Sequence, residues 1–201
     1  WKRAKDSDCI LDLHSAGHAR YVQHVIFHDK ETFPLLRTFG FDFAIRRSQG
    51  KEGKGGSLAA EARRQGILAF SLELGGGHIV FLEDVDSGLR AILSFLRSLG
   101  CLPSARRTRL TSLRRIYMHD ARVFARSPVD GVVYLHCELN DKILKGMPLA
   151  TCIDLTSLRR YVLKSPASGR IVYLRTKSRI GHGETVAMIL PLFSSLGADV
   201  A

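Results

Sequence analysis

The sequence lacks several features that would assign it to a broad class of protein. It contains no run of 18 or more apolar residues, so we expect no transmembrane helix. Its first residues, 1–6, lack the apolar segment of a secretory signal, and no initiator Met precedes them. We therefore predict a cytoplasmic protein, and the sequence has the character of a piece of a longer chain.

Three chemical motifs are also missing. None of the four cysteines forms a C-x-x-C pair, which argues against a zinc ribbon or a redox motif and predicts reduced thiols. No G-x-S-x-G elbow is present, so a serine hydrolase of that type is not indicated. The basic residues are not interleaved with aromatic residues, and we expect no specific nucleic-acid binding.

Charge is distributed unevenly along the chain. The formal net charge is +11, and residues 104–201 carry 16 basic and 7 acidic side chains, whereas residues 1–103 carry 14 and 12. The excess therefore belongs to the second half. It favours acidic partners, although a solvated basic surface explains it equally well.

Two apolar runs in the first half each end near an ionisable residue. Ile10 to Ser15 contains His14, and Ile67 to Gly77 contains Glu73 just before three glycines. Such runs predict buried strands of a parallel sheet, and chemistry gathers at the carboxyl ends of those strands. A lone buried carboxylate is costly, so Glu73 needs a physical reason.

Helical patterns alternate with these strands and predict an α/β layer. We expect a loop at 15–24, a short strand at 25–27, a helical stretch at 33–41, a glycine-rich surface loop at 48–56, and helices at 57–65 and 85–99. Ser57 is the expected N-cap of the first long helix, and Asp84 or Asp86 that of the second.

The second half contains an internal repeat. Ser127-Pro128-Val129-Asp130-Gly131 matches Ser165-Pro166-Ala167-Ser168-Gly169 at an offset of 38 residues. Short alternating strands broken by Pro and Gly predict an all-β module, and two copies suggest a pseudo-twofold sandwich. We divide the chain into an α/β part (1–103), a basic connection (104–118) and a β module (119–194).

Several residues in the first half could carry chemistry. His14 could ligate a metal, with Asp12 on the same side of the strand as an acceptor for its imidazole, or it could be a hydrogen-bonded core histidine. Glu73 could be a general base or a paired strand-end carboxylate. Arg46 and Arg47 could bind a substrate carboxylate or be solvated. We expect surface or loop roles for most of the remaining first-half histidines, which are His18, His24, His28 and His78.

The order of these parts resembles the succinylglutamate desuccinylase/aspartoacylase family over residues 8–192. The resemblance is carried by Asp12-Leu13-His14-Ser15, by Gly-Gly-Ser before a helix, by Glu73-Leu74-Gly75-Gly76-Gly77, and by an amphipathic helix followed by a β module. It implies a zinc-carboxypeptidase-like parallel or mixed sheet with helices. It also implies that the β module is similar to a barrel-sandwich hybrid, here without a lysine for lipoylation or biotinylation.

The resemblance further implies that His14 is a Zn²⁺ ligand and Glu73 the general base of a deacylase for small N-acyl amino acids or related esters. The family's upstream His-x-x-Glu motif, which supplies the other zinc ligands, is absent, so we expect an N-terminally truncated member with weak or no metal binding. Exposed sheet edges would favour a homo-oligomer. The alternative function is a non-catalytic scaffold that uses its basic β module to bind acidic partners.

Overall fold

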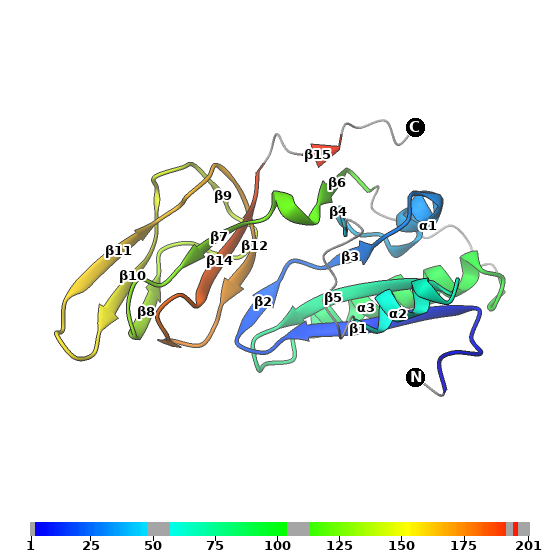
Figure 1. Cartoon of the computed structure of the whole chain (residues 1–201), viewed down its shortest axis with the longest axis horizontal. Helices are drawn as coiled ribbons and strands as arrows, with labels where there is room; N and C mark the ends of the chain where they lie inside the picture. Colours follow the sequence, from blue (N-terminus) through cyan, green and yellow to red (C-terminus); the bar gives the residue numbers. More distant parts are fainter. Residues whose placement is uncertain (1–2, 48–56, 104–112, 192–194, 197–201) are drawn as a thin grey trace.

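The computed structural model describes residues 3–47, 57–103, 113–191 and 195–196. An α/β half leads into a β-rich half, and the two lie end to end (Figure 1). The loop predicted at 48–56 and residues 104–112 of the predicted basic connection lie outside the described residues. Within the described part, no helix is both long and apolar enough to cross a membrane.

The α/β half is built on a mixed sheet, as predicted. Its strands are β1 (Cys9–Ala16), β2 (Ala19–Tyr21), β3 (His24–Phe27), β4 (Phe43–Arg46), β5 (Leu68–Gly76) and β6 (Arg115–Met118). β1 pairs with β5, β3 with β4, and β4 with β6 in parallel, whereas β3 and β5 are antiparallel. The carboxyl ends of β1 and β5 are therefore directed toward one end of the sheet, and those of β3, β4 and β6 toward the opposite end.

Helices pack on this sheet and enclose an aromatic core. They are α1 (Phe33–Leu36), α2 (Leu58–Arg64), α3 (Leu82–Ser98) and the 3₁₀ turns η1 (Lys30–Thr32), η2 (Arg37–Phe39) and η3 (His119–Ala121). Phe39 stacks on Phe95 with ring centroids 4.8 Å apart, and Phe70 meets both rings edge-on. All three rings are buried, so they hold η2, α3 and β5 together.

The predicted helix starts were partly right. The Ser57 hydroxyl accepts a hydrogen bond from the Ala60 N–H and caps α2, as expected. α3 begins three residues earlier than predicted, and its N-cap is Phe81, so the expected cap by Asp84 or Asp86 is wrong. Asp84 instead lies in the first turn with its carboxylate buried, because it accepts hydrogen bonds from the side chains of Arg20 and Gln23.

Two strands of the sheet were not predicted. β2 lies inside the segment expected to be a loop, and β4 follows the helical stretch without a separate signal. β2 has only three residues and gains its backbone partners from strands distant in sequence, β5 and β12. Such a strand is specified by its neighbours rather than by its own pattern of apolar residues.

The repeat predicted in the second half appears as two matching sets of strands. They are β7 (Val123–Arg126), β8 (Gly131–Leu135), β9 (Lys142–Ile143) and β10 (Pro148–Asp154), followed by β11 (Arg160–Lys164), β12 (Gly169–Arg175), β13 (Arg179–Ile180) and β14 (Thr185–Leu190). The strand order β11-β10-β8-β13 in one sheet corresponds to β7-β14-β12-β9 in the other. Each sheet therefore combines two strands from each copy, and neither closes on itself.

Turns are shared between the copies in the same way. The N–H groups of Ser127 and Ser165 donate to the carbonyls of Glu184 and Met147 at 2.9 and 2.8 Å, each in the other copy. Both serine hydroxyls also donate to the carbonyl two residues later at 2.7 Å. The pseudo-twofold relation thus extends to individual hydrogen bonds, whereas a barrel-sandwich hybrid stays a prediction.

One sheet continues across the two halves. β2 pairs with β12, and the Val22 N–H donates to the Val172 carbonyl at 2.9 Å. The short β15 (Ser195–Leu196) returns to pair with β6 (Figure 1). The division at residues 103 and 118 stays a prediction, because backbone pairing crosses between the two predicted parts.

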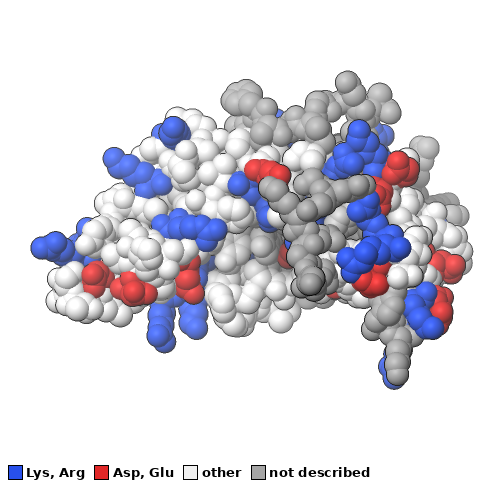
Figure 2. Space-filling view, viewed as in Figure 1, with Lys and Arg blue, Asp and Glu red and all other residues white. Residues whose placement is uncertain are grey.

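Basic side chains are spread over both halves on the face in Figure 2. They project from the β-rich end at the left and are mixed with acidic side chains at the right. On this face the positive charge is therefore not gathered into a single patch.

Candidate functional site

The sheet brings His14 and Glu73 side by side. They are register partners on the parallel strands β1 and β5, so their side chains point to the same face. On the other side of β5, His24 of β3 is the register partner of Glu73. Two imidazoles that are distant in sequence therefore flank one carboxylate, and the predicted convergence of His14 and Glu73 is present.

His14 has the partner that its position on an extended strand predicts. Its Nε2 lies 2.9 Å from the Asp12 carboxylate, and its side chain is 47% exposed. The imidazole is thus oriented by a neighbouring carboxylate and open to solvent on its remaining surface. This exposure argues against a core histidine and leaves His14 free to meet a ligand.

Burial is the main influence on Glu73. It raises the pKa of the carboxyl group above its ordinary value, and Asp12 adds to this effect, while His14, Arg122 and Arg47 oppose it. The carboxylate is therefore partly desolvated but has positive charges around it. Such a group is a stronger base than a solvated glutamate.

Arg122 joins this site from the second half of the chain and was not anticipated. It follows η3, and its Nε–H donates to the His119 carbonyl at 2.9 Å. This hydrogen bond holds the guanidinium group against the backbone of η3. Burial lowers the pKa of Arg122, and the nearby Tyr21 and Glu73 oppose that effect. Burial together with the guanidinium groups of Arg122 and Arg47 lowers the pKa of His119 to about 4.

Tyr21 is a further member that the sequence did not indicate. Burial and the neighbouring Glu73 raise its pKa to about 12, so its hydroxyl stays protonated. Its ring meets those of His24 and Tyr173 edge-on, with centroids 5.6 and 5.0 Å apart. No local signal could have found Tyr21, because its strand, β2, was not recognised.

The two predicted substrate-binding arginines, Arg46 and Arg47, have different surroundings. Arg47 is one of the charges that act on Glu73. Arg46 instead donates from Nε to the His28 carbonyl at 3.1 Å, inside the fold. Of the pair, only Arg47 is in a position to contribute to the Glu73 site.

His24 is a neutral histidine buried beneath this site. Burial lowers its pKa to about 4, and its Nδ1–H donates to the Val22 carbonyl at 2.8 Å. Its ring stacks on Phe43, with centroids 4.9 Å apart. His24 is buried on β3, so the expectation of a surface or loop role is wrong for this residue, whereas His28 lies in the connection after β3, although it is buried.

The glycines after Glu73 serve close backbone packing. Gly75, Gly76 and Gly77 all have positive φ angles. A Cβ atom at Gly75 would lie 2.1 Å from the Asp84 carboxylate, and one at Gly76 would lie 2.2 Å from the Ala16 carbonyl. The described contacts of these glycines are therefore with the protein's own chain.

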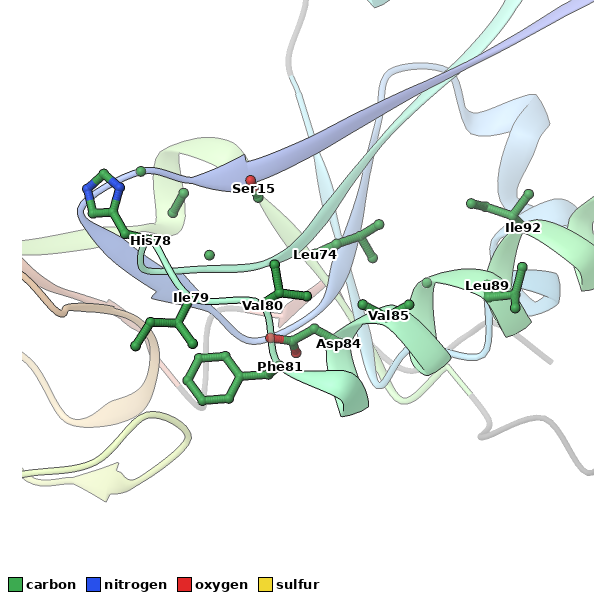
Figure 3. A pocket seen from close by; sticks show the side chains of 14 residues that line it. Ser15, Leu74, His78, Ile79, Val80, Phe81, Asp84, Val85, Leu89 and Ile92 are labelled. Carbon is green, nitrogen blue, oxygen red and sulfur yellow. The ribbon is translucent and has the colours of Figure 1, made fainter.

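An apolar groove lies on the other side of the sheet. It encloses about 490 Å³ between β1, the turn after β5 and α3. Leu74, Ile79, Val80 and Val85 line it, with Asp84 below them (Figure 3). Leu74 follows Glu73 on the strand and so faces the opposite way. The groove is therefore separate from the side chain of Glu73.

A complete metal site is not formed by the described residues. They contain no group of three or more His, Cys, Asp or Glu side chains that could hold a metal ion. A catalytic zinc site ordinarily has three protein ligands. His14 with Asp12 fits one ligand and its acceptor, and the full donor set is not present in this part of the chain.

Comparisons with solved structures show the same fold. A succinylglutamate desuccinylase/aspartoacylase from Rhodobacter sphaeroides has a TM-score of 0.77 and 20% identity, covering 92% of this chain and 58% of its own. The product-bound ectoine utilization protein EutE (DoeB) from Ruegeria pomeroyi has a TM-score of 0.75 and 21% identity, with 89% and 56% covered.

A succinylglutamate desuccinylase from a Silicibacter species gives a TM-score of 0.78 at 18% identity, with 91% of this chain and 57% of its own covered. The chain thus spans less than two thirds of the length of each of these structures. No curated protein matches the sequence. Residues 2–99 match the model of the succinylglutamate desuccinylase/aspartoacylase catalytic domain, and through them the chain belongs to the succinylglutamate desuccinylase/aspartoacylase family.

Proposed function

We propose that this chain carries part of the catalytic centre of a zinc-dependent deacylase, with Glu73 as the general base. The substrate class is a small N-acyl amino acid or a related ester. The observation that carries this proposal is the partly desolvated Glu73 carboxylate, held beside His14 and near two guanidinium groups, in a chain of a deacylase family.

Glu73 has the properties that proton abstraction from water requires. Its burial raises the pKa, which strengthens it as a base, and the neighbouring positive charges favour its ionised form. A water molecule deprotonated beside Glu73 would attack the acyl carbonyl. Glu73 would then hand the proton to the leaving amine, as microscopic reversibility allows.

Arg47 and Arg122 give this site a preference for anions. Both act on Glu73, and the two groups also disfavour one another's charge, because the pKa of Arg122 is lowered by burial and by Arg47. A substrate carboxylate placed between them would relieve that repulsion and accept charge-assisted hydrogen bonds. This supports an amino-acid-like substrate, with Arg47 rather than Arg46 as the contact.

His14 is the one residue that we propose as a zinc ligand. Because the described residues do not form a complete ligand set, we derive no catalytic step through the metal. Further ligands would have to come from residues outside those described. The scaffold alternative has less support, because a binding module has no need for a buried base among arginines.

The first test is hydrolysis of N-acetyl and N-succinyl amino acids by the protein expressed from its own coding sequence, followed through the amine released. Glu73→Gln removes the base and should lower kcat by about 10²- to 10⁴-fold. Glu138→Gln, an exposed carboxylate of the β-rich half, is the matched control and should leave kcat unchanged. Unchanged turnover in Glu73→Gln would reject Glu73 as the base.

Zinc binding is tested separately by calorimetric titration with the metal. His14→Ala should weaken zinc binding by at least about tenfold, whereas His182→Ala, an exposed histidine away from the site, should not. Equal zinc affinity in the two variants would remove His14 from the metal site while leaving the role of Glu73 to be decided by the kinetics.

A further inference from the structure

A second cavity lies where β4 and β6 begin, and β3 separates β4 from the Glu73 strand β5. It encloses about 320 Å³ where the α/β half meets the β-rich half. Buried apolar and aromatic side chains form its floor, namely Phe43, Tyr117, Val172 and Leu190. Its rim is basic and consists of Arg114, Arg115, Lys142 and Arg170.

The basic rim is poorly neutralised. Asp42 is the one carboxylate among the described residues that line the cavity. It lies 3.4 Å from the Arg170 guanidinium and 4.0 Å from that of Arg114, which are long contacts for ion pairs. One carboxylate cannot balance Arg114, Lys142 and Arg170 together, so the cavity keeps a positive potential.

The backbone holds these cations together despite their repulsion. Lys142 and Arg170 are directly opposite one another on the antiparallel strands β9 and β12. Like charges in this relation destabilise a sheet. Arg114 is fixed on the facing side, because its N–H donates to the Asp42 carbonyl at 2.8 Å. Arg170 also donates to the Asn140 side chain and lies over the Phe43 ring, which accounts for its own position. Lys142 opposite it and Arg114 nearby add repulsion that an anionic ligand would relieve.

We infer that this cavity is a binding site for a small soluble anion that carries phosphate groups. Guanidinium groups match phosphate oxygens in bidentate geometry, and an ammonium group adds a point charge. The apolar floor, to which Phe43 and Tyr117 contribute, would accept an organic portion of the ligand. The volume suits a compound of the size of a sugar phosphate or a nucleoside phosphate rather than a polymer.

This site is independent of the proposed deacylase. The described residues that line the cavity do not include His14, Glu73, Arg47 or Arg122. Loss of Glu73 would therefore leave the cavity intact, and loss of Lys142 would leave Glu73 intact. The two proposals can fail separately.

The test is calorimetric titration of the whole chain with inorganic pyrophosphate and with adenosine monophosphate at constant ionic strength. Lys142→Gln should weaken binding by about tenfold or more, and Arg170→Gln by a similar or larger factor. Arg160→Gln removes the same charge from an exposed position on β11 and should leave binding nearly unchanged. Thermal unfolding should show that Lys142→Gln, whose side chain is exposed, keeps the fold.

Three results would overturn the inference. Equal affinity in Lys142→Gln and the wild-type chain would show that the cavity does not bind the probe. Equal weakening in Arg160→Gln would show a response to net charge alone. Preferential binding to a single-stranded oligonucleotide, or to phosphatidylcholine vesicles only when they contain phosphatidic acid, would point to a polymer or a membrane surface instead.

Discussion

The two halves of this molecule use their polar groups in opposite ways. In the β-rich half, the same contacts occur twice, once in each copy of the repeat, as the hydroxyls of Ser127 and Ser165 demonstrate. In the α/β half, the polar network around Glu73 has no counterpart of this kind. Duplicated contacts are what a scaffold requires, whereas a single asymmetric cluster at strand ends is typical of a site for chemistry.

The largest expected difference between the two halves is the loss of stability when a glycine in each half is replaced by alanine. In the α/β half, Gly76→Ala combines a φ of +124° with a Cβ only 2.2 Å from the Ala16 carbonyl, so we expect a loss of about 3 kcal/mol or more in the free energy of unfolding. In the β-rich half, Gly146→Ala has a φ of +87° but open space, and it should cost about 1 kcal/mol. Urea denaturation measures both.

Equal losses in the two glycine variants would contradict this expectation. They would mean that the backbone angle alone matters and that the contact between β5 and β1 relaxes freely. The difference between the variants therefore reports how rigidly the Glu73 strand is held against the His14 strand.

The buried histidine of the α/β half makes stability depend on pH. Burial lowers the pKa of His24 from 6.5 to about 4. Between these pH values the unfolded chain therefore binds a proton at His24 that the folded chain does not bind. Stability should therefore be complete above pH 6.5 and fall as pH is lowered toward 4, by at most about 3 kcal/mol from this group. Denaturant unfolding across this pH range measures the effect.

His24→Phe keeps a ring against Phe43 but removes the titrating group. The variant should show a flatter pH dependence than the wild-type chain between pH 6.5 and 4, with His119 still contributing. His136→Phe, an exposed histidine of the β-rich half, is the control and should keep the wild-type slope. An unchanged slope in His24→Phe would show that His24 is not the buried neutral group.

The repeat offers a smaller and symmetric effect. Ser127→Ala and Ser165→Ala each remove one buried hydroxyl that donates to a carbonyl two residues later. Each should cost about 1 kcal/mol, and the two costs should agree within a few tenths, as measured by urea denaturation. A large difference would break the comparison, because the two copies would then not be energetically equivalent.

The smallest expected effect is a change in the pKa of Glu73 when a neighbouring positive charge is removed. Burial raises the pKa of Glu73, while Arg122 opposes the rise, so Arg122→Gln should raise that pKa further without unfolding the chain. Carbon-13 NMR titration of the carboxyl group measures it, and Arg126→Gln, an exposed arginine on β7, is the control. If the two variants gave the same Glu73 pKa, Arg122 would not belong to the site.

The sequence predicted the parts of this fold that depend on near neighbours in the chain. The apolar runs around His14 and Glu73, the Ser57 cap and the repeat all have local patterns. Their register could also be expected in outline, since parallel strands align their carboxyl ends. These local patterns are sufficient to identify His14 and Glu73 as a pair.

What the sequence did not predict depends on contacts across long distances. Tyr21 lies on a strand of three residues whose partners are 55 or more positions away. Arg122 acts on Glu73 from the turn after β6, a strand that runs in the opposite direction to β5 and is separated from it by β4 and β3. Asp84 looked like a helix cap, yet the approach of Arg20 and the absence of a side chain at Gly75 gave its carboxylate a buried position.

The pairing of β2 with β12 has a consequence for how the protein is assembled. Tyr21 and Tyr173 are register partners on these strands, and each belongs to a different half of the chain. Synthesis on the ribosome must therefore pass β12 before the first strands acquire all of their neighbours. Dividing the gene between the two halves would therefore leave the backbone groups of β2 and β12 without their partners, and each product would expose a strand that can pair with other chains.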